Sequence, residues 1–300
     1  MTPLFIGPEA EARLDWAALG RAFEAGHRLP RAQVEDSFLY RGTDTILSRA
    51  AWIDGLGALV KTATIFPGNP AAGKPTVGGA VSLLSDVDGT LAATLDFGLV
   101  TKWKTAGDSV HAATRLARPD SRRILIVGAG TVARSLHEAY GAAFPEARFA
   151  VWSRSGDSAA AFATEHGIDH AIDLETAVGE ADIVTCATMT TEPILRGAWL
   201  RPGQHVDLIG AYRPDMREAD DEALRRASVF VDARATTLDH IGELKIPLAA
   251  GVIAAEDVRA DYYDGDTMRR DSEAEITLFK NGGGAHLDLM TAHYILQAVS

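Results

Sequence analysis

The chain has 300 residues, 47% hydrophobic and 23% charged, which is typical of a soluble globular protein with one large or two ordinary domains. Its net charge is -12 and its lysines and arginines form no cluster, so nucleic acid is not an expected partner. No stretch approaches the roughly 20 uninterrupted apolar residues of a membrane span, and the acidic N-terminal segment does not resemble a signal peptide. The single cysteine, Cys186, lies in an apolar run and fits a core position in a cytoplasmic protein.

The first third of the chain has the pattern of strands joined by hairpins. A helix is expected over Glu9–Ala25, and strands follow from about residue 35 to 100. Val77–Leu84 and Thr90–Phe97 flank the segment Asp86–Gly89, whose Asp-Gly pair predicts a hairpin turn. Two aspartates also occur in calcium loops, but the later ligand positions are missing here, so a turn is the favoured interpretation.

From residue 108 onward, helices alternate with short apolar strands. A helix is expected over Asp108–Leu116, ending before Pro119. Five runs have the composition of buried strands: Ile124–Val127, Phe149–Trp152, Ile183–Cys186, His205–Ile209 and Val229–Val231. Helical stretches between some of them include Ser158–His166 and Asp221–Arg226. This alternation predicts an α/β fold with a parallel sheet covered on both faces. A last helix, Leu287–Val299, follows the glycine-rich turn Asn281–Gly284, and both ends of the chain are expected to share one domain.

The segment Gly128-Ala129-Gly130-Thr131-Val132-Ala133 carries the strongest functional signal. It follows an apolar strand and opens a predicted helix, Thr131–Ala142, as a dinucleotide-binding fingerprint must. Gly128 permits the tight turn, Gly130 lets the backbone approach a pyrophosphate, and Ala133 allows close packing of helix on strand. The helix N-terminus attracts the anion. The alternative is an ordinary glycine turn, but the surrounding strands favour a nucleotide site.

The end of the second strand predicts which dinucleotide binds. NAD enzymes usually carry Asp or Glu there, to bind the ribose hydroxyls. This chain has Ser153-Arg154-Ser155, and an arginine flanked by hydroxyls suits a ribose 2′-phosphate. Asp157 lies too far along the chain to replace the missing acid. NADP(H) is therefore expected in preference to NAD(H); the alternative is that Arg154 is a solvated surface residue.

Four blocks of sequence, in order, resemble the ornithine cyclodeaminase/mu-crystallin family. They are Lys61 with Pro67-Gly68-Asn69 and Gly73–Thr76, Leu99–Thr101 with Lys104–Ala106, Val127–Gly130, and Phe279-Lys280 with Gly284 and Asp288. The resemblance implies a Rossmann doubly wound parallel sheet that binds NADP(H), at residues 113–271. It also implies a discontinuous α+β, barrel-like domain for substrate binding and dimerisation, at residues 1–112 and 272–300.

The resemblance also implies roles for individual residues. Arg41 and Lys104 would hold a substrate carboxylate, with Thr76 in the same substrate-binding set, and Lys61 would be the catalytic residue beside the reacting carbon and nitrogen. Several segments would border the cofactor: Thr105, Gly128–Ala133, Ser153–Ser155, Ala187-Thr188-Met189, Gly210 and Tyr212. The chemistry agrees, because a carboxylate favours convergent cations and a lysine can supply a proton to an imine. Taken singly, each charged residue is more often a surface group.

Two departures from the family pattern bear on the reaction. Lys104 stands where the family usually has arginine, so a bidentate fork becomes a point charge. Tyr212 stands where ornithine cyclodeaminases carry the aspartate that handles the amine, and a phenol with a pKa of about 10 is not an anionic base at neutral pH. Asp215 would need a different loop path to replace it. The segment therefore resembles the ketimine reductases of the family.

The resulting hypothesis is NADPH-dependent reduction of a small cyclic ketimine. Candidates are Δ1-pyrroline-2-carboxylate, giving L-proline, and Δ1-piperideine-2-carboxylate, giving L-pipecolate. The alternatives are an ornithine cyclodeaminase, an alanine-type amino-acid dehydrogenase, and a non-catalytic NADP(H)-binding protein. The expected partners are the small imino or amino acid and a second copy of the chain, with no nucleic acid and no membrane. The 9 histidines are scattered, and no metal is expected.

Overall fold

The structure is a computed structural model, and it describes residues 3–300. The chain divides into two compact units, Met1–Lys104 with Gly284–Ser300, and Thr105–Gly283. The sequence-based boundaries, 112/113 and 271/272, therefore differ from the observed ones at 104/105 and 283/284. The second boundary differs because strand β14 (Thr277–Lys280) belongs to the sheet of the second unit. Each unit is described separately below.

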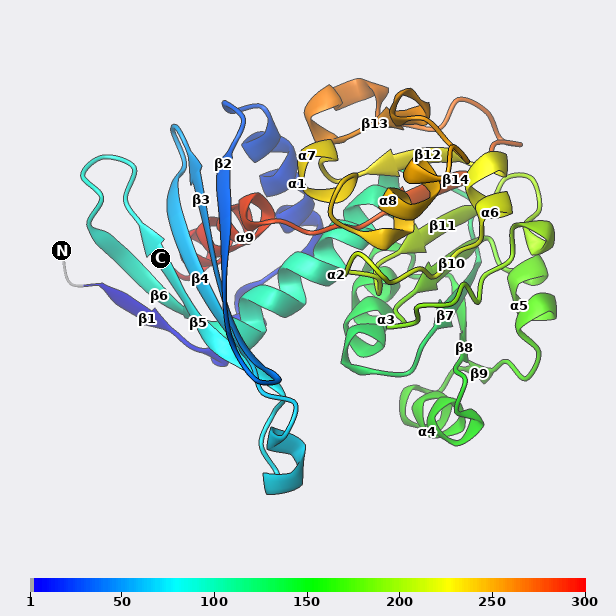
Figure 1. Ribbon diagram of the computed structural model, residues 1–300, viewed down its shortest axis with the longest axis horizontal. Coiled ribbons are helices and arrows are strands. Elements are labelled where there is room, and N and C mark those ends of the chain that lie inside the picture. The colour runs from blue at the N-terminus through cyan, green and yellow to red at the C-terminus, as the bar shows by residue number, and fades with distance from the viewer. Residues whose placement is uncertain (1–2) are drawn as a thin grey trace. The chain divides into compact units, whose positions relative to one another are not determined.

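The second unit is built on an eight-stranded sheet in the order β13-β12-β14-β11-β10-β7-β8-β9, paired in parallel throughout (Figure 1). The strands are β7 (Arg123–Val127), β8 (Arg148–Trp152), β9 (Asp169–His170), β10 (Ile183–Cys186), β11 (His205–Leu208), β12 (Ser228–Val231), β13 (Val258–Ala260) and β14. Strand order reverses at β7, with β8 and β9 on one side and β10 and β11 on the other. This is the Rossmann arrangement, and it confirms the predicted fold class.

Helices cover both faces of this sheet, because alternate side chains of each buried strand point to opposite sides. On one face, Ile126 of β7 packs with α3 (Thr131–Ala143) and α4 (Gly156–His166). On the other face, Leu125 and Val127 pack with α5 (Leu174–Glu180), α6 (Asp221–Arg226) and α8 (Gly242–Ala249). A short helix, α7 (Arg234–Thr237), follows β12. The predicted core position of Cys186 is confirmed. Within residues 3–300, no helix has the length and apolarity needed to cross a membrane.

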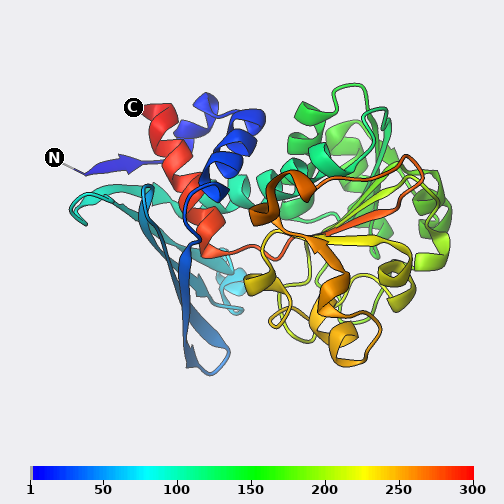
Figure 2. The same cartoon turned by 90° about the horizontal axis from the view of Figure 1, so that it is seen from above.

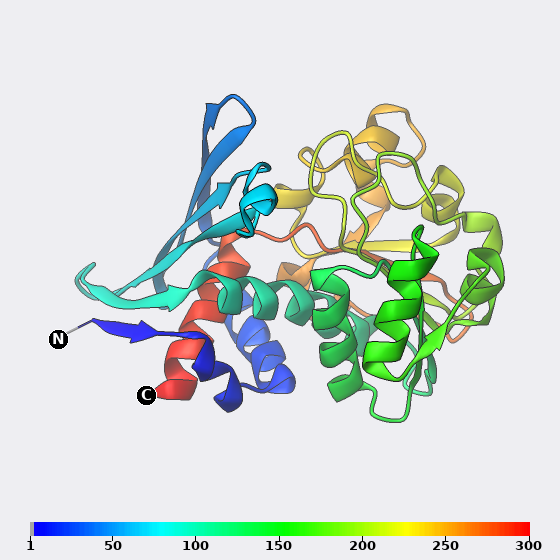
Figure 3. The ribbon, with the colours of Figure 1, turned by 90° about the horizontal axis from the view of Figure 1, so that it is seen from below.

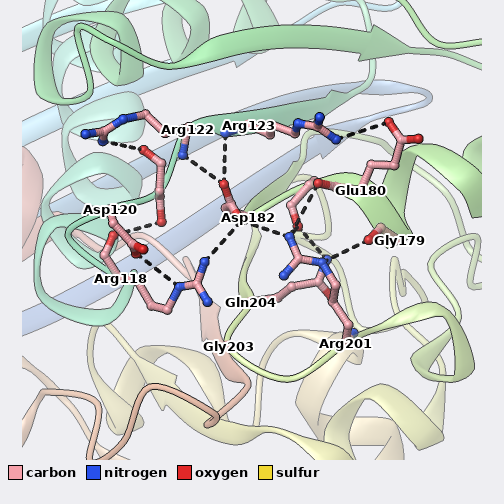
Figure 4. Close-up of polar contacts among 12 residues, drawn as sticks. Arg118, Asp120, Arg122, Arg123, Gly179, Glu180, Asp182, Arg201, Gly203 and Gln204 are labelled. Carbon is pink, nitrogen blue, oxygen red and sulfur yellow. Dashed lines mark hydrogen bonds and ion pairs between the residues drawn. The ribbon is translucent and has the colours of Figure 1, made fainter.

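A cluster centred on Asp182 ties together the amino ends of the parallel strands (Figure 4). Its carboxylate accepts hydrogen bonds from the backbone N–H of Arg122 (2.8 Å) and Arg123 (3.1 Å), at the start of β7. It also pairs with Arg201 at 2.8 Å and Arg118 at 3.3 Å. Burial acts to raise the pKa of this carboxyl, but the hydrogen bonds and Arg201 outweigh it and lower the pKa. The amino edge is thus closed by structural ion pairs, and ligands in such folds bind at the opposite, carboxyl edge.

The first unit contains a six-stranded sheet in the order β1-β6-β5-β4-β3-β2. Its strands are β1 (Leu4–Ile6), β2 (Gln33–Arg41), β3 (Asp44–Ile53), β4 (Gly57–Ile65), β5 (Val77–Leu84) and β6 (Leu91–Asp96). Strands β2 to β6 are antiparallel, and β1 adds in parallel to β6. The predicted hairpin over Asp86–Gly89 is confirmed between β5 and β6. The sheet is open, with β1 and β2 as its edges.

Two helices pack in the first unit. Helix α9 (Ala285–Val299) crosses one face of the sheet and lies beside α1 (Trp16–His27), as Figure 2 and Figure 3 show from opposite sides. The last predicted helix is confirmed. The single N-terminal helix predicted over Glu9–Ala25 is wrong, because a 3-10 helix (Pro8–Arg13) precedes α1 and the two are separate. The side chain of Asp15 accepts a hydrogen bond from the N–H of Ala18 and so starts a new helix.

The helix predicted over Asp108–Leu116 begins earlier than expected. Helix α2 runs from Phe97 to Leu116, so the strand expected over Thr90–Phe97 ends at Asp96. The physical reason is a cap: Asp96 Oδ1 accepts a 2.7 Å hydrogen bond from the N–H of Leu99. The earlier start places the substrate candidate Lys104 and the cofactor candidate Thr105 on one continuous helix.

Candidate active site

The glycine fingerprint forms an open, uncapped helix N-terminus at the carboxyl edge of the parallel sheet. Gly128 follows β7 with a φ of 118°, and its N–H donates to Trp152 O at 2.7 Å. A Cβ on Gly128 would lie 2.8 Å from Ala187 O, so only glycine fits there. Gly130 occupies the N-cap position of α3 but has no side chain to bond the first-turn N–H groups, and a Cβ there would meet nothing within 4 Å. Ala133 is fully buried between helix and strand. This geometry fits a pyrophosphate, whose oxygens would accept from the free first-turn N–H groups.

The segment after β8 offers one exposed cation beside the fingerprint. Arg154 is exposed, and within residues 3–300 its guanidinium forms no ion pair. Ser155 Oγ is already engaged, because it accepts from Ser158 N at 3.3 Å and caps α4. Ser153 is half-buried, and Asp157 lies exposed in the first turn of α4. Of the three residues predicted for the 2′-phosphate, Arg154 and Ser153 therefore remain available, while Ser155 has a structural role.

The two loops predicted to border the cofactor touch each other closely. Ala187-Thr188-Met189 follows β10, and Gly210 lies just beyond β11. A Cβ on Gly210 would overlap Thr188 O, so the loops can approach only because this residue is glycine. Tyr212 is 59% exposed, at the same edge. Thr105 of α2 is also held here, since its carbonyl accepts from Asn281 Nδ2 at 3.1 Å.

Sequence reasoning missed the buried carboxylate that fastens these loops. Glu218 accepts from the N–H and hydroxyl of Thr188 at 2.7 and 2.8 Å, and from the N–H of Gly210 at 2.7 Å. Glu243 in turn accepts from the N–H of Glu218 at 2.7 Å. Burial raises the pKa of Glu218, which Lys280 opposes. Lys280 is itself fully buried and donates to Leu208 O and Asn281 O. Nothing in the local pattern around Glu218 signals burial, because it lies among other charged residues.

In the first unit, Lys61 forms a buried ion pair with Asp288. Lys61 Nζ of β4 donates to Asp288 Oδ1 of α9 at 2.8 Å, and it lies 4.8 Å from the centre of the Phe97 ring. Burial lowers the pKa of Lys61; Asp288 opposes this, and the neighbouring cations Lys104 and Arg49 add to it. The pKa of Asp288 is also lowered, because the three cations outweigh the effect of burial.

Positive charge exceeds negative charge around this pair. Lys61, Lys104 and Arg49 all act on the single buried carboxylate of Asp288, and Arg49 Nη1 lies 3.7 Å from its Oδ2. Such an excess in a poorly solvated site favours a bound anion, and a carboxylate forms charge-assisted hydrogen bonds with lysine and arginine. Sequence reasoning identified Lys61 and Lys104. It did not assign Arg49, and it named Asp288 only as part of a resembling block.

The other two predicted substrate residues lie elsewhere on the same sheet. Arg41 is at the tip of the β2–β3 hairpin, 79% exposed and paired with Asp44 at 2.9 Å. Its guanidinium lies over the Phe66 ring, and Thr76 O accepts from the N–H of Phe66. Because Arg41 is opposite Asp44, it lies about 17 Å along β3 from Arg49, at ~3.4 Å per residue. The structure therefore does not bring Arg41 or Thr76 next to Lys61.

The ornithine cyclodeaminase/mu-crystallin family model matches residues 53–300. This chain belongs to that family. It is 53% identical to the Δ1-pyrroline-2-carboxylate reductase of Paracoccus denitrificans, over 97% of this chain and 95% of that protein. The predicted family membership is confirmed.

Solved structures of the family agree with the fold. The chain matches a Thermococcus litoralis Δ1-pyrroline-2-carboxylate reductase in complex with NADH and L-proline, with a TM-score of 0.88 and 26% identity, over 99% of this chain and 97% of that one. It also matches an archaeal alanine dehydrogenase dimer with bound NAD, with a TM-score of 0.89 and 27% identity, over 100% of this chain and 96% of that one.

Proposed function

We propose that this protein reduces the C=N bond of Δ1-pyrroline-2-carboxylate to give L-proline, using NADPH. It is an oxidoreductase that acts on C=N bonds with a nicotinamide cofactor. The choice of substrate rests on the Lys61–Asp288 pair, around which the cations Lys61, Lys104 and Arg49 outnumber the carboxylates. It is supported by the 53% identity to a Δ1-pyrroline-2-carboxylate reductase. Δ1-piperideine-2-carboxylate, with a ring larger by one carbon, is the second candidate.

The residues of the chain divide the work of this reaction. The reduced nicotinamide, when bound, supplies a hydride to the imine carbon. Lys104 and a second cation would fix the substrate carboxylate and so orient the ring. Lys61 would hold a proton at Nζ next to the ring nitrogen, which becomes an amine as the C=N bond is reduced. Asp288 keeps Lys61 in place and favours its charged form, against the effect of burial. The α3 N-terminus would hold the pyrophosphate of the cofactor.

The preference for NADPH is supported by the exposed Arg154 next to the fingerprint and by the lack of an acid at the end of β8. A carboxylate at that position would repel a 2′-phosphate, whereas an arginine binds it with charge-assisted hydrogen bonds. NADH remains the alternative cofactor, and the Thermococcus litoralis enzyme was solved with NADH.

A direct assay tests the function. Purified protein is supplied with each cyclic imine, with ornithine, and with pyruvate plus ammonia, and NADPH or NADH oxidation and ammonia release are followed. We expect NADPH oxidation with Δ1-pyrroline-2-carboxylate, and L-proline as the product. Ammonia release from ornithine without imine reduction would instead identify a cyclodeaminase, and turnover of pyruvate with ammonia alone would identify an alanine-type dehydrogenase. Cofactor binding without any turnover would indicate a non-catalytic protein.

We further propose a cytoplasmic homodimer that pairs through the first unit's sheet. The sheet face opposite Lys61 exposes the apolar side chains Leu39, Ile46, Trp52 and Val60. Exposed apolar surface of this kind marks an interface, and the similar archaeal alanine dehydrogenase is a dimer. Light scattering should give twice the chain mass of 31.9 kDa, and Trp52→Glu should shift the protein toward monomer. A monomeric wild-type protein would overturn this proposal.

A further inference from the structure

We propose that Arg49, and not Arg41, is the arginine that binds the substrate carboxylate. The inference deepens the proposed function and rests on it. It assigns the second cation of the carboxylate site. Lys104 alone cannot bind both carboxylate oxygens in a fixed geometry, because an ammonium is a point charge, whereas a guanidinium is a planar fork of donors.

Strand register places Arg49 in the row of Lys61. Arg49 of β3 is directly opposite Lys61 of β4 on one side and Asp36 of β2 on the other. Directly opposite residues in an antiparallel pair have their side chains on the same face, about 5 Å apart. Arg49 thus shares the face of Lys61.

Arg41 is excluded by the same register. It is opposite Asp44, which is an odd number of residues from Arg49 along β3. Because side chains alternate along a strand, Asp44 and Arg41 point to the other face of the sheet. Arg41 is therefore both on the wrong face and several residues too far along the strand to meet a ligand held at Lys61.

The Asp36 carboxylate orients the guanidinium of Arg49 and leaves its Nη1 available to a second carboxylate. Its Nε and Nη2 donate to the two oxygens of Asp36 at 3.3 and 2.7 Å, a bidentate pair that fixes the plane of the group. Nη1 points toward Asp288 Oδ2 at 3.7 Å, too far for a hydrogen bond. Asp288 Oδ2 is buried and accepts no hydrogen bond from residues 3–300. The Arg49 side chain remains 23% exposed, and Nη1 is the guanidinium nitrogen that does not donate to Asp36.

The charges of the side chains around Lys61 balance only when a further anion binds. Lys61, Lys104 and Arg49 contribute three positive charges, against the carboxylates of Asp36 and Asp288. Burial acts to lower the pKa of Arg49, but Asp288 and Asp36 raise it above its ordinary value, so this residue stays charged. One substrate carboxylate brings the group to neutrality, with Nη1 of Arg49 and Nζ of Lys104 as its donors.

The test compares Arg49→Gln with Arg41→Gln as the matched control. With Δ1-pyrroline-2-carboxylate and NADPH, Arg49→Gln should raise KM about 10- to 100-fold, the loss expected for a hydrogen bond to a charged group. The Kd for NADPH, measured by fluorescence, should not change. Arg41→Gln should leave both constants within about twofold of wild type. Arg49→Lys keeps the positive charge but loses the bidentate guanidinium, so its KM should be intermediate. This variant replaces Arg49→Gln in the test if the glutamine variant does not fold.

A second substrate shows whether the effect concerns the carboxylate. Δ1-Pyrroline lacks that group, so wild type and Arg49→Gln should reduce it equally poorly. An unchanged KM for Δ1-pyrroline-2-carboxylate in Arg49→Gln and Arg49→Lys, or a larger increase in Arg41→Gln, would overturn the inference alone. A wild-type protein that reduces neither cyclic imine overturns the proposed function, and the inference with it.

Discussion

Lys61 and Asp288, 227 positions apart in the chain, are joined by a buried 2.8 Å hydrogen bond between β4 and α9. Replacing Lys61 with alanine should lower turnover by about 100-fold or more, since it removes the group that we propose holds a proton beside the reacting nitrogen. NADPH fluorescence should report unchanged cofactor binding. Because an unpaired buried charge costs about 3–5 kcal/mol, the variant should also unfold more easily. Unchanged turnover would remove Lys61 from the mechanism, and Lys74→Ala, at an exposed position, is the control.

The role of Asp288 is best seen in a pH profile. Asp288 raises the pKa of Lys61 against burial. In Asp288→Asn that support is lost, so the lysine gives up its proton at lower pH. The alkaline limb of kcat should therefore move to lower pH in the variant, with little change in KM for NADPH. A profile that keeps its wild-type position would show that the pair has only a structural role.

Arg154→Ala should change the choice of cofactor. The KM for NADPH should rise by the equivalent of about 1.5–3 kcal/mol, the value of a hydrogen bond to a charged group, while the KM for NADH stays nearly constant. Steady-state kinetics with both cofactors provide the measurement. Ser155→Ala is a useful comparison, because its hydroxyl caps α4. It should cost about 1 kcal/mol of stability and leave the preference unchanged. Equal effects of Arg154→Ala on both cofactors would refute the 2′-phosphate assignment.

Glu218→Gln should loosen the two loops that are predicted to border the cofactor. The amide keeps the shape of the side chain but has one acceptor oxygen, whereas the carboxylate accepts from both Thr188 and Gly210. We expect a KM for NADPH raised about 10-fold or more, together with lower thermal stability. Glu222→Gln, in α6, is the control. If the melting temperature falls while the KM for NADPH stays at its wild-type value, Glu218 supports the fold and not the site.

Asp207 should make stability depend on pH. Burial raises its pKa to about 6, although Thr185, Ser109 and Tyr140 donate hydrogen bonds to it. A carboxyl whose pKa is raised in the folded state holds its proton there. Its contribution to the free energy of unfolding is therefore full below the pKa of the unfolded state, about 3.9, and is lost as pH rises through about 6. The loss is on the order of 2–3 kcal/mol. Denaturant titrations of Asp207→Asn should therefore vary less between pH 4 and 7 than those of wild type; parallel curves would contradict this.

The parts of the fold predicted from sequence depend on local signals. The fingerprint at Gly128–Ala133 joins a strand to a helix within a few residues, and the Asp-Gly hairpin is equally local. Both were predicted because their chemistry is contained in short segments. The early start of α2 also has a local signal, the capping residue Asp96, but the helical spacing of the apolar residues predicts only the part from Asp108 onward.

The parts that were missed depend on distant partners. Strand β14 is four residues long and ends in Lys280, a residue rarely found fully buried, so its place inside the sheet has no signal of its own. Arg49 and Asp288 meet Lys61 only through strand register and the docking of α9. A surface arginine and an active-site arginine have the same sequence pattern until that register is known.

The position of β14 has a consequence for biosynthesis. This strand lies between β11 and β12, yet it is made after both of them and after β13. While the chain emerges from the ribosome, the edges of β11 and β12 that pair with β14 stay open until residue 280 is available. Helix α9, which carries Asp288 onto the first sheet, is made later still. A chain that stops before residue 277 would therefore lack a central strand of the second sheet as well as helix α9, so both units would stay incomplete.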